Sequence, residues 1–273
     1  MRSLCLLGLL VWSSVARAGD ADAIAKLLAT QSQADSSSIF TDDAVLFVRS
    51  ATISLPVDRL SSPSELADLV APPSTAPGSE GAKDPQIAIA RGGKSAWASF
   101  TVQLTINNTP SFYFRVSDAL VKTDHGWRIA ATAWTEPVAN DRANKDAKAG
   151  KLSIDKLDVP GGDASLAAAF AKLGHDGLDA TATARKELVA IGSGPGERTI
   201  GGGVLARAWK AAWVGHVATS SLVARVLPSG TTGWVVATIE LDKKTYKLPF
   251  LVFCMFDKTD KGEWSLVHIH FAV

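Results

Sequence analysis

The chain has too few cysteines for a disulfide framework. Its 273 residues include 2 cysteines, and Cys5 lies in an N-terminal segment that we expect to be removed. One remaining cysteine cannot form an internal disulfide, even in the oxidising compartment that such a segment implies. Because Cys254 stands in the apolar run 251–256, we expect it to be a buried small hydrophobe.

Patterns typical of several ligand classes are also missing. The chain has no block of Lys and Arg interleaved with aromatic residues, and its formal net charge is +1, so we expect no nucleic-acid partner. The three glycines at 201–203 precede a predicted helix, but no Walker or Gly-x-Gly-x-x-Gly spacing surrounds them, so we expect a flexible loop and no cofactor. We also expect no metal, because no third ligand lies near the pair His268 and His270.

Residues 1–18 have the pattern of a signal peptide. Arg2 provides a positive charge, residues 4–12 are apolar, and residues 16–18 form a small-x-small cleavage site. The apolar run is too short to span a bilayer, so we expect no membrane span in the mature chain. These features predict an exported protein, periplasmic or secreted, that begins at Gly19.

Two parts of the chain end on the same short pattern. Lys-Thr-Asp-His-Gly-Trp stands at 122–127 and Lys-Thr-Asp-Lys-Gly-Glu-Trp at 258–264, and Trp97 and Trp234 each stand 30 residues before the final tryptophan. A turn and a tryptophan repeated at a fixed distance indicate a duplicated unit. We therefore divide the mature chain into a first domain, a linker and a second domain, at residues 19–137, 138–159 and 160–273.

Each predicted domain contains helices followed by a run of antiparallel strands. In the first domain we expect helices at 20–34 and from 61 onward, strands at 39–48, 95–106, 111–122 and 127–135, and a loop at 71–85. In the second domain we expect helices at 163–173, 180–186 and 204–214, strands at 187–191, 221–226, 232–241, 245–256 and 264–273, and a glycine-rich loop at 192–203. This order is typical of an α+β fold in which a sheet packs on helices.

The predicted strand 95–106 has two unlike faces. One face is apolar and carries Ala98, Phe100, Val102, Leu104 and Ile106, and the other carries Trp97, Ser99, Thr101 and Gln103. Alternation of this kind predicts a sheet whose two faces meet different surroundings.

Short motifs in both halves resemble the nuclear-transport-factor-2-like superfamily, SnoaL-like branch. They are Phe-Thr-Asp-Asp-Ala-Val at 40–45 with Gly-Trp-Arg-Ile at 126–129, and Ile-Gly-Ser-Gly-Pro-Gly-Glu at 191–197 with Trp234 and Trp-Ser-Leu-Val-His-Ile-His at 264–270. The resemblance implies two tandem cone-shaped α+β domains, each a curved, mostly antiparallel sheet on about three helices around an apolar pocket. Family members include ketosteroid isomerase, polyketide cyclases, dehydratases and non-catalytic modules. Such domains often dimerise through their sheets, so we expect the two halves to form an intramolecular pseudo-dimer.

His268 and His270 are the main candidates for catalytic residues. Their spacing places both on one face of a strand, and an imidazole in an apolar pocket can act as general acid or base. Two other interpretations stay open: a hydrogen-bonded interior pair, or an incomplete metal pair. The first half has Ala131 and Ala133 at the matching positions, so any pocket chemistry is expected in the second half.

Glu197 is the candidate partner of these histidines. It follows a Gly-Pro-Gly loop, in a region where the resemblance implies acids near the pocket mouth. The alternative is a solvated loop acid that pairs with Arg198 or Arg207.

The expected ligand-pocket residues are Trp209, Arg225, Trp234 and Trp264. A charge within an apolar strand is costly unless it is paired, so we expect Arg225 to have Glu240 as its cross-strand partner. The chain has 2 tyrosines, and neither matches the oxyanion tyrosine that ketosteroid isomerase has. This departure weakens the enzyme interpretation.

These observations favour non-catalytic binding of a small apolar ligand or a protein partner. The alternative is a SnoaL-like isomerase, cyclase or dehydratase without metal, acting in the second-domain pocket. A third possibility is an assembly module of an envelope complex. Catalysis requires both imidazoles to face a closed cavity with Glu197 within ~3 Å, whereas ligand binding requires a pocket of ~300 Å³ or more. The sequence leaves open whether Asn107, in a glycosylation sequon, is modified.

Overall fold

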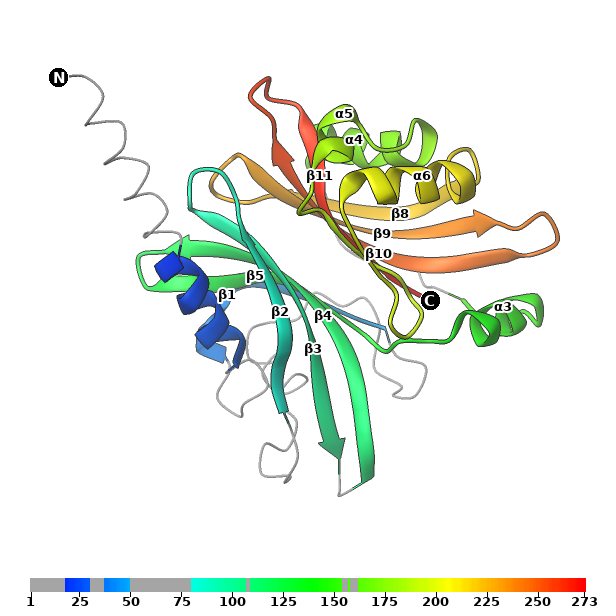
Figure 1. The fold of residues 1–273 in the computed structure, drawn as a ribbon, viewed down its shortest axis with the longest axis horizontal. Coiled ribbons are helices and arrows are strands. Elements are labelled where there is room, and N and C mark those ends of the chain that lie inside the picture. The colour runs from blue at the N-terminus through cyan, green and yellow to red at the C-terminus, as the bar shows by residue number, and fades with distance from the viewer. Residues whose placement is uncertain (1–17, 30–36, 50–79, 107–108, 154–156, 158–161) are drawn as a thin grey trace.

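A computed structural model describes residues 18–29, 37–49, 80–106, 109–153, 157 and 162–273 (Figure 1). The predicted signal peptide, except Ala18, the predicted helix that starts at 61, and Asn107 lie outside the described residues. Within the described ranges, no helix has the length and hydropathy needed to cross a membrane.

The described strands form two sheets, of five and six strands. The first sheet has the order β1-β5-β4-β3-β2, with bounds β1 Phe40–Arg49, β2 Glu80–Ile89, β3 Ser95–Ile106, β4 Thr109–Thr123 and β5 Gly126–Thr135. The second has the order β7-β6-β11-β10-β9-β8, with bounds β6 Val189–Ile191, β7 Arg198–Ile200, β8 Val217–Val226, β9 Thr232–Asp242, β10 Lys247–Lys258 and β11 Trp264–Ala272.

Both sheets share one pairing scheme. β1 runs parallel to β5, as β6 does to β11, and every other neighbouring pair is antiparallel. Apart from the added edge strand β7, the order β6-β11-β10-β9-β8 repeats the order β1-β5-β4-β3-β2. The final strand of each half therefore lies inside its sheet, where both of its edges are paired.

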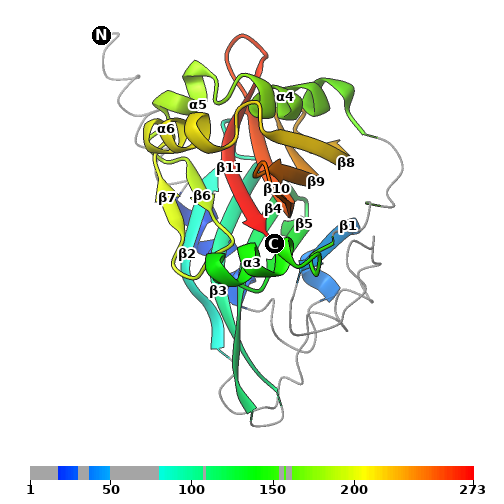
Figure 2. The ribbon, with the colours of Figure 1, turned by 90° about the vertical axis from the view of Figure 1, so that its right-hand side faces the viewer.

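Helices cover one face of each sheet (Figures 1 and 2). The helices α4 Ala164–His175, α5 Ala180–Ala184 and α6 Gly202–Ala212 lie on the second sheet, and we call residues 164–273 the second cone. Asp163 and Asp179 cap α4 and α5 by accepting hydrogen bonds from backbone amides, which satisfies donors that a helix start leaves free. The helix at 18–29 packs on the first sheet through Ile24 and Leu28.

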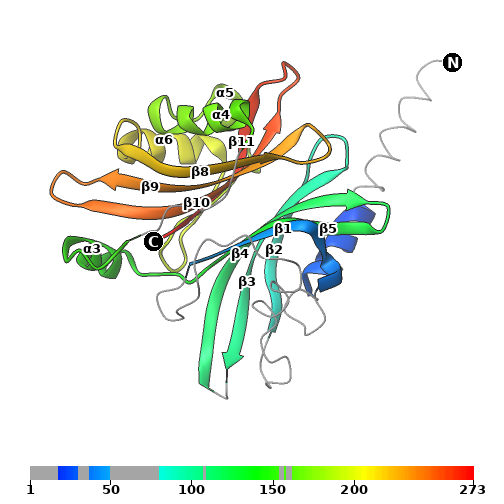
Figure 3. The same ribbon diagram turned by 180° about the vertical axis from the view of Figure 1, so that it is seen from behind.

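The uncovered faces of the two sheets pack against each other (Figure 3), and we call this contact the seam. One buried cluster combines residues of both sheets: Val45, Phe47, Trp97, Ala119, Ala131 and Ala133 from the first, and Val189, Ile191, Val223, Trp234, Val236, Phe253 and Met255 from the second. The rings of Phe47 and Trp234 meet edge-on, with centroids 6.0 Å apart. An α+β fold with two sheets and helices, as predicted, is confirmed.

Two segments differ from the sequence-based prediction, at β2 and β7. β2 begins at Glu80, inside the predicted loop 71–85. Its last residues alternate Ile87 and Ile89 with smaller or polar neighbours, and the strand pairs with β3. β7 lies inside the predicted loop 192–203 and consists of three residues held by pairing with β6. The predicted linker contains the helix α3 Asn140–Lys148.

The glycine run before α6 serves close packing. A Cβ at Gly202 would overlap the carbonyl oxygen of Ala182 in α5, so only glycine allows α6 to start against that backbone. The amide of Gly202 donates to the carbonyl of Arg185 at 2.7 Å. The predicted flexible loop is thus a helix contact, and the start of α6 is at Gly202.

Candidate functional site

His268 and His270 lie in the seam. β11 alternates its side chains, so Ile269 and Phe271 point into the second cone while the two imidazoles point to the first sheet. The histidine residues are 0% and 1% exposed, respectively. The indole of Trp97 from β3 stacks on the His268 ring, with centroids 4.6 Å apart and planes 15° apart.

The two imidazoles belong to a chain of hydrogen bonds across the seam. Ser117 Oγ on β4 lies 2.9 Å from His268 Nε2 and 2.8 Å from His270 Nδ1. Thr135 Oγ1 on β5 lies 2.7 Å from His270 Nε2, and the Val189 carbonyl lies 3.0 Å from His268 Nδ1. Sequence analysis missed Ser117 and Thr135, because nothing in the pattern of one strand tells which residue of a distant strand it meets.

The Val189 carbonyl, at one end of this series of hydrogen bonds, determines every proton position. A carbonyl only accepts, so His268 Nδ1 carries a proton and, in the neutral ring, Nε2 accepts from the Ser117 hydroxyl. That hydroxyl has one proton, so it must accept from His270 Nδ1–H. His270 Nε2 then accepts from Thr135. All four bonds are made when both rings are neutral.

Both imidazoles are held in the neutral form. Burial is the largest cause that lowers the pKa of His268 to about 3, although its bond to the Val189 carbonyl acts in the opposite direction. Burial, then His268 and Arg115, also lower the pKa of His270 well below its usual value. Buried, neutral and fully bonded, the pair has the properties of a structural element, and neither histidine lines the two cavities described below.

Glu197 is engaged elsewhere. Its Oε2 accepts from the amide of Gly194 at 2.8 Å, and its Oε1 contacts Asn140 Nδ2. A Cβ at Gly192 or Gly194 would collide with this side chain, so the glycines of the loop make room for it. Among the described residues, no hydrogen bond joins Glu197 to either imidazole. Glu197 therefore stabilises the loop in which it lies.

The residues expected around a ligand pocket lie in three different places. Trp234 is in the seam, and Trp264 is half-buried against the core of the second cone, where its Nε1 donates to Ser165 Oγ at 2.9 Å. Arg225 pairs across the strands with Trp234 and places its guanidinium carbon 5.8 Å from the ring centroid. The prediction that Glu240 is its partner is therefore wrong.

The ring under Arg225 explains that difference. Glu240 lies opposite Ala218 in the register of β8 and β9, and it pairs with Lys247 at 2.6 Å. An arginine over an aromatic face is stabilised without a carboxylate.

Trp209 lies in the wall of a cavity inside the second cone. The cavity has a volume of about 310 Å³. Its buried wall is made by Phe170, Leu173, Trp209, Ile239, Val252 and Phe271, and its rim includes His175, Val217 and Thr219. The indole N–H of Trp209 is already bonded to the Leu173 carbonyl at 2.8 Å. The wall therefore offers a ligand an apolar surface.

Cys254 is buried in the second cone as predicted, and burial raises the pKa of its thiol. Within the described ranges, no three side chains of His, Cys, Asp or Glu lie together in a way that suits a metal ion.

One protein family matches part of the chain. Residues 164–273 match the family described as the SnoaL-like domain. No curated protein matches the chain. A nuclear-transport-factor-2-like protein with a cystatin-like fold from Novosphingobium aromaticivorans is 15% identical over 56% of this chain and 99% of that chain, with a TM-score of 0.37. A domain with a cystatin-like fold from Nostoc punctiforme is 15% identical over 50% and 88% of the two chains, with a TM-score of 0.36. Residues 164–273 are thus similar to the SnoaL-like domain family.

Proposed function

We propose that this protein binds a small apolar molecule in the second cone without converting it. The observation that carries the proposal is the cavity of about 310 Å³ between the helices and the second sheet. Its size is at the lower end of the range for small-molecule sites. Burial of the ligand's apolar surface against Phe170, Trp209 and Phe271 drives binding.

Catalysis is the weaker alternative. An isomerase, cyclase or dehydratase needs an acid or base that reaches its substrate. The imidazoles of His268 and His270 lie in the seam, on the face of β11 opposite to Phe271 and the cavity. At the cavity rim, the side chain of His175 is 89% exposed and contacts the carboxylate of Asp176, so it lies in solvent rather than inside the cavity.

We further propose that the chain is an exported intramolecular pseudo-dimer of two tandem SnoaL-like domains, residues 19–137 and 160–273. The repeated strand order of the two sheets and their shared apolar cluster support the duplication. Export rests on the pattern of residues 1–18. Fusing two domains removes the entropy cost of bringing separate subunits together.

A fluorescence titration with N-phenyl-1-naphthylamine, an uncharged probe, tests ligand binding. The unmodified chain should bind the probe, and Val217→Phe, which places a ring at the cavity rim, should weaken binding by about tenfold or more. Ala218→Phe is the matched control, because Ala218 is the next residue on β8 and is exposed on the other face. Equal binding by both variants, with melting temperatures unchanged, would contradict the proposal.

A further inference from the structure

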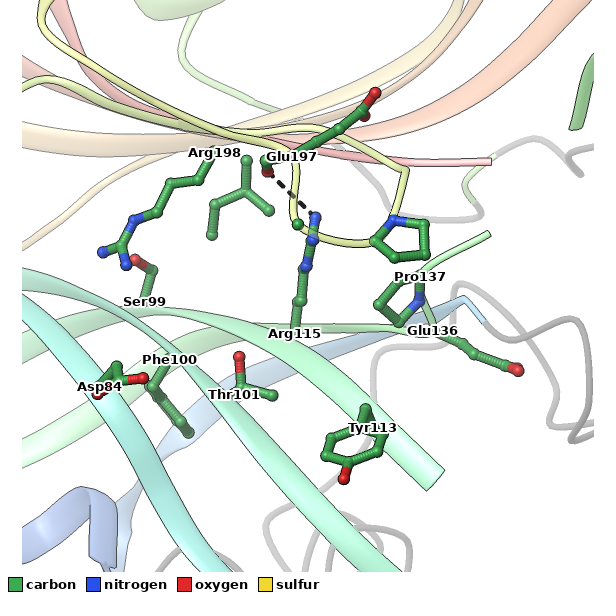
Figure 4. Close-up of a pocket in the computed structure, with 13 residues that line it drawn as sticks. Asp84, Ser99, Phe100, Thr101, Tyr113, Arg115, Glu136, Pro137, Glu197 and Arg198 are labelled. Atoms are coloured by element: carbon green, nitrogen blue, oxygen red, sulfur yellow. Dashed lines mark hydrogen bonds between the residues drawn. The ribbon is translucent and has the colours of Figure 1, made fainter. Parts of the chain in front are cut away.

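A second hollow lies between the first sheet and the loop that precedes β7 (Figure 4). It has a volume of about 560 Å³. Residues of β2, β3 and β4 line it from one side and residues 195–198 from the other. The lining includes neither His268 nor His270. We call it the inter-sheet cleft.

Ser99 leaves an unused hydroxyl in the wall of the inter-sheet cleft. The residue is 1% exposed, and among the described residues its Oγ has no hydrogen-bond partner. Its neighbour across the strands, Ser117, has two partners. A buried hydroxyl without a partner is unfavourable, and a ligand that accepts its proton removes this cost.

Two arginines line the inter-sheet cleft from opposite sides, Arg115 on β4 and Arg198 on β7. Arg115 Nη1 donates to the carbonyls of Gly192 and Glu197 at 2.6 and 3.2 Å, which holds its guanidinium in place. Burial is the largest cause that lowers the pKa of Arg115; the charge of Glu197 acts in the opposite direction, and the charge of Arg198 lowers the pKa further. Figure 4 shows Arg198 directed toward Ser99.

Arg198 has no carboxylate partner in the described part of the chain. Its positive charge also contributes to the lowered pKa of His268. The two guanidinium groups thus raise the potential in the inter-sheet cleft, and an anion placed between them relieves their repulsion.

Three acidic residues also line the inter-sheet cleft. The carboxylate of Glu197 is bonded to the Gly194 amide, and Figure 4 shows that it and the Glu136 carboxylate are directed away from the cleft. Asp84 lies across the cleft, on β2. The part lined by Ser99, Arg115 and Arg198 therefore favours an anion, while Ile191, Pro137, Pro195 and the exposed ring of Tyr113 supply apolar surface.

We propose that the inter-sheet cleft binds a small organic carboxylate with an apolar body. The carboxylate accepts from the Arg198 guanidinium and the Ser99 hydroxyl, and Arg115 adds positive potential. The apolar body lies against Ile191 and the two prolines. This site is separate from the cavity of the second cone and does not depend on the function proposed there.

Isothermal titration of the full chain with 2-naphthoate and with uncharged 2-naphthamide tests this proposal. The naphthoate should bind at least tenfold more tightly than the amide, and Arg198→Gln should remove about that factor. Arg207→Gln is the matched control: Arg207 is exposed on α6, outside the cleft lining, and its loss should leave affinity unchanged. Ser99→Ala should weaken binding severalfold while the melting temperature stays the same or rises, because the hydroxyl has no partner to lose.

Three results would overturn the proposal: no binding of naphthoate, equal binding of naphthoate and amide, or an unchanged affinity in Arg198→Gln. Loss of affinity in Ser99→Ala together with a lowered melting temperature would assign Ser99 a structural role instead. Val217→Phe, which changes the rim of the second-cone cavity, should leave naphthoate affinity unchanged. The proposals for the second-cone cavity and for the inter-sheet cleft can therefore be tested independently.

Discussion

Ser117 and His270 lie 153 residues apart in the chain, yet the serine Oγ and the imidazole Nδ1 are 2.8 Å apart. This bond joins β4 of the first sheet to β11 of the second. The same hydroxyl also meets His268, so one serine joins the two histidines in one series of hydrogen bonds. These hydrogen bonds favour one register of the largely apolar seam, because a shifted packing would bury unpaired donors and acceptors.

The buried histidines predict that the protein loses stability in acid. The pKa of His268 falls from 6.5 in the unfolded chain to about 3 in the fold, so between these values the unfolded chain binds more protons. Stability present above pH 6.5 is therefore lost as the pH falls toward about 3, by up to about 1.4 kcal/mol per pH unit for each histidine. Urea unfolding at several pH values measures this slope.

Two variants separate the histidines from the carboxylates that also titrate in acid. His268→Gln should flatten the slope between pH 6 and 4, whereas His125→Gln, at an exposed turn, should leave it unchanged. The same slope in both variants would show that the seam histidines do not govern acid stability.

Ser117 and Ser99 form a matched pair for testing the hydrogen-bond chain. They face each other across β3 and β4 and are 0% and 1% exposed, but Ser117 has two imidazole partners while Ser99 Oγ has none among the described residues. Ser117→Ala leaves one buried donor and one buried acceptor unpaired and should cost about 2–5 kcal/mol. Ser99→Ala should change the free energy of unfolding by less than about 0.5 kcal/mol. Chemical denaturation compares them, and equal losses would contradict the proposed tautomers.

Gly202 and Gly203 are adjacent glycines with opposite expected responses. Gly202→Ala places a Cβ against the Ala182 carbonyl and should destabilise the fold by about 1–3 kcal/mol or more. At Gly203 the nearest atom to an added Cβ is 3.7 Å away, so Gly203→Ala should be neutral or stabilise α6 by up to about 1 kcal/mol. Thermal unfolding tests both. A similar loss in the two variants would mean that the glycines act through chain flexibility rather than close packing.

The prediction from sequence succeeded where the evidence is local. Alternation placed Phe100 and Val102 in the first core and Trp97 and Ser99 on the other face, and the structure has them so. Pro, Ser and Gly composition misled at β2, because tertiary pairing with β3 outweighs local preference. β7 has three residues, which are too few to show a periodic pattern in the sequence.

The candidate site was predicted in part. The spacing of His268 and His270 predicts a shared face, and one open interpretation, a hydrogen-bonded interior pair, matches their contacts with Ser117. The cross-strand partner of Arg225 was predicted wrongly, because the register of β8 and β9 follows from the whole sheet. The apolar cavity required the positions of α4 and α6 over the strands.

The sequence by itself determined which side chains share a face of each strand and where α4 and α5 begin. Both follow from backbone geometry within a few residues: the period of two along a strand, and the unpaired amides that Asp163 and Asp179 cap. Tertiary structure alone decided which faces meet. Because the polar face of β3 and β4 lies in the seam, Ser117 contacts two histidines, and Ser99 and Arg115 line the inter-sheet cleft. Contacts between residues so far apart in the chain depend on how the complete sheets pack. The free energy of that packing is a sum over many residues, so no single segment of the sequence reveals it.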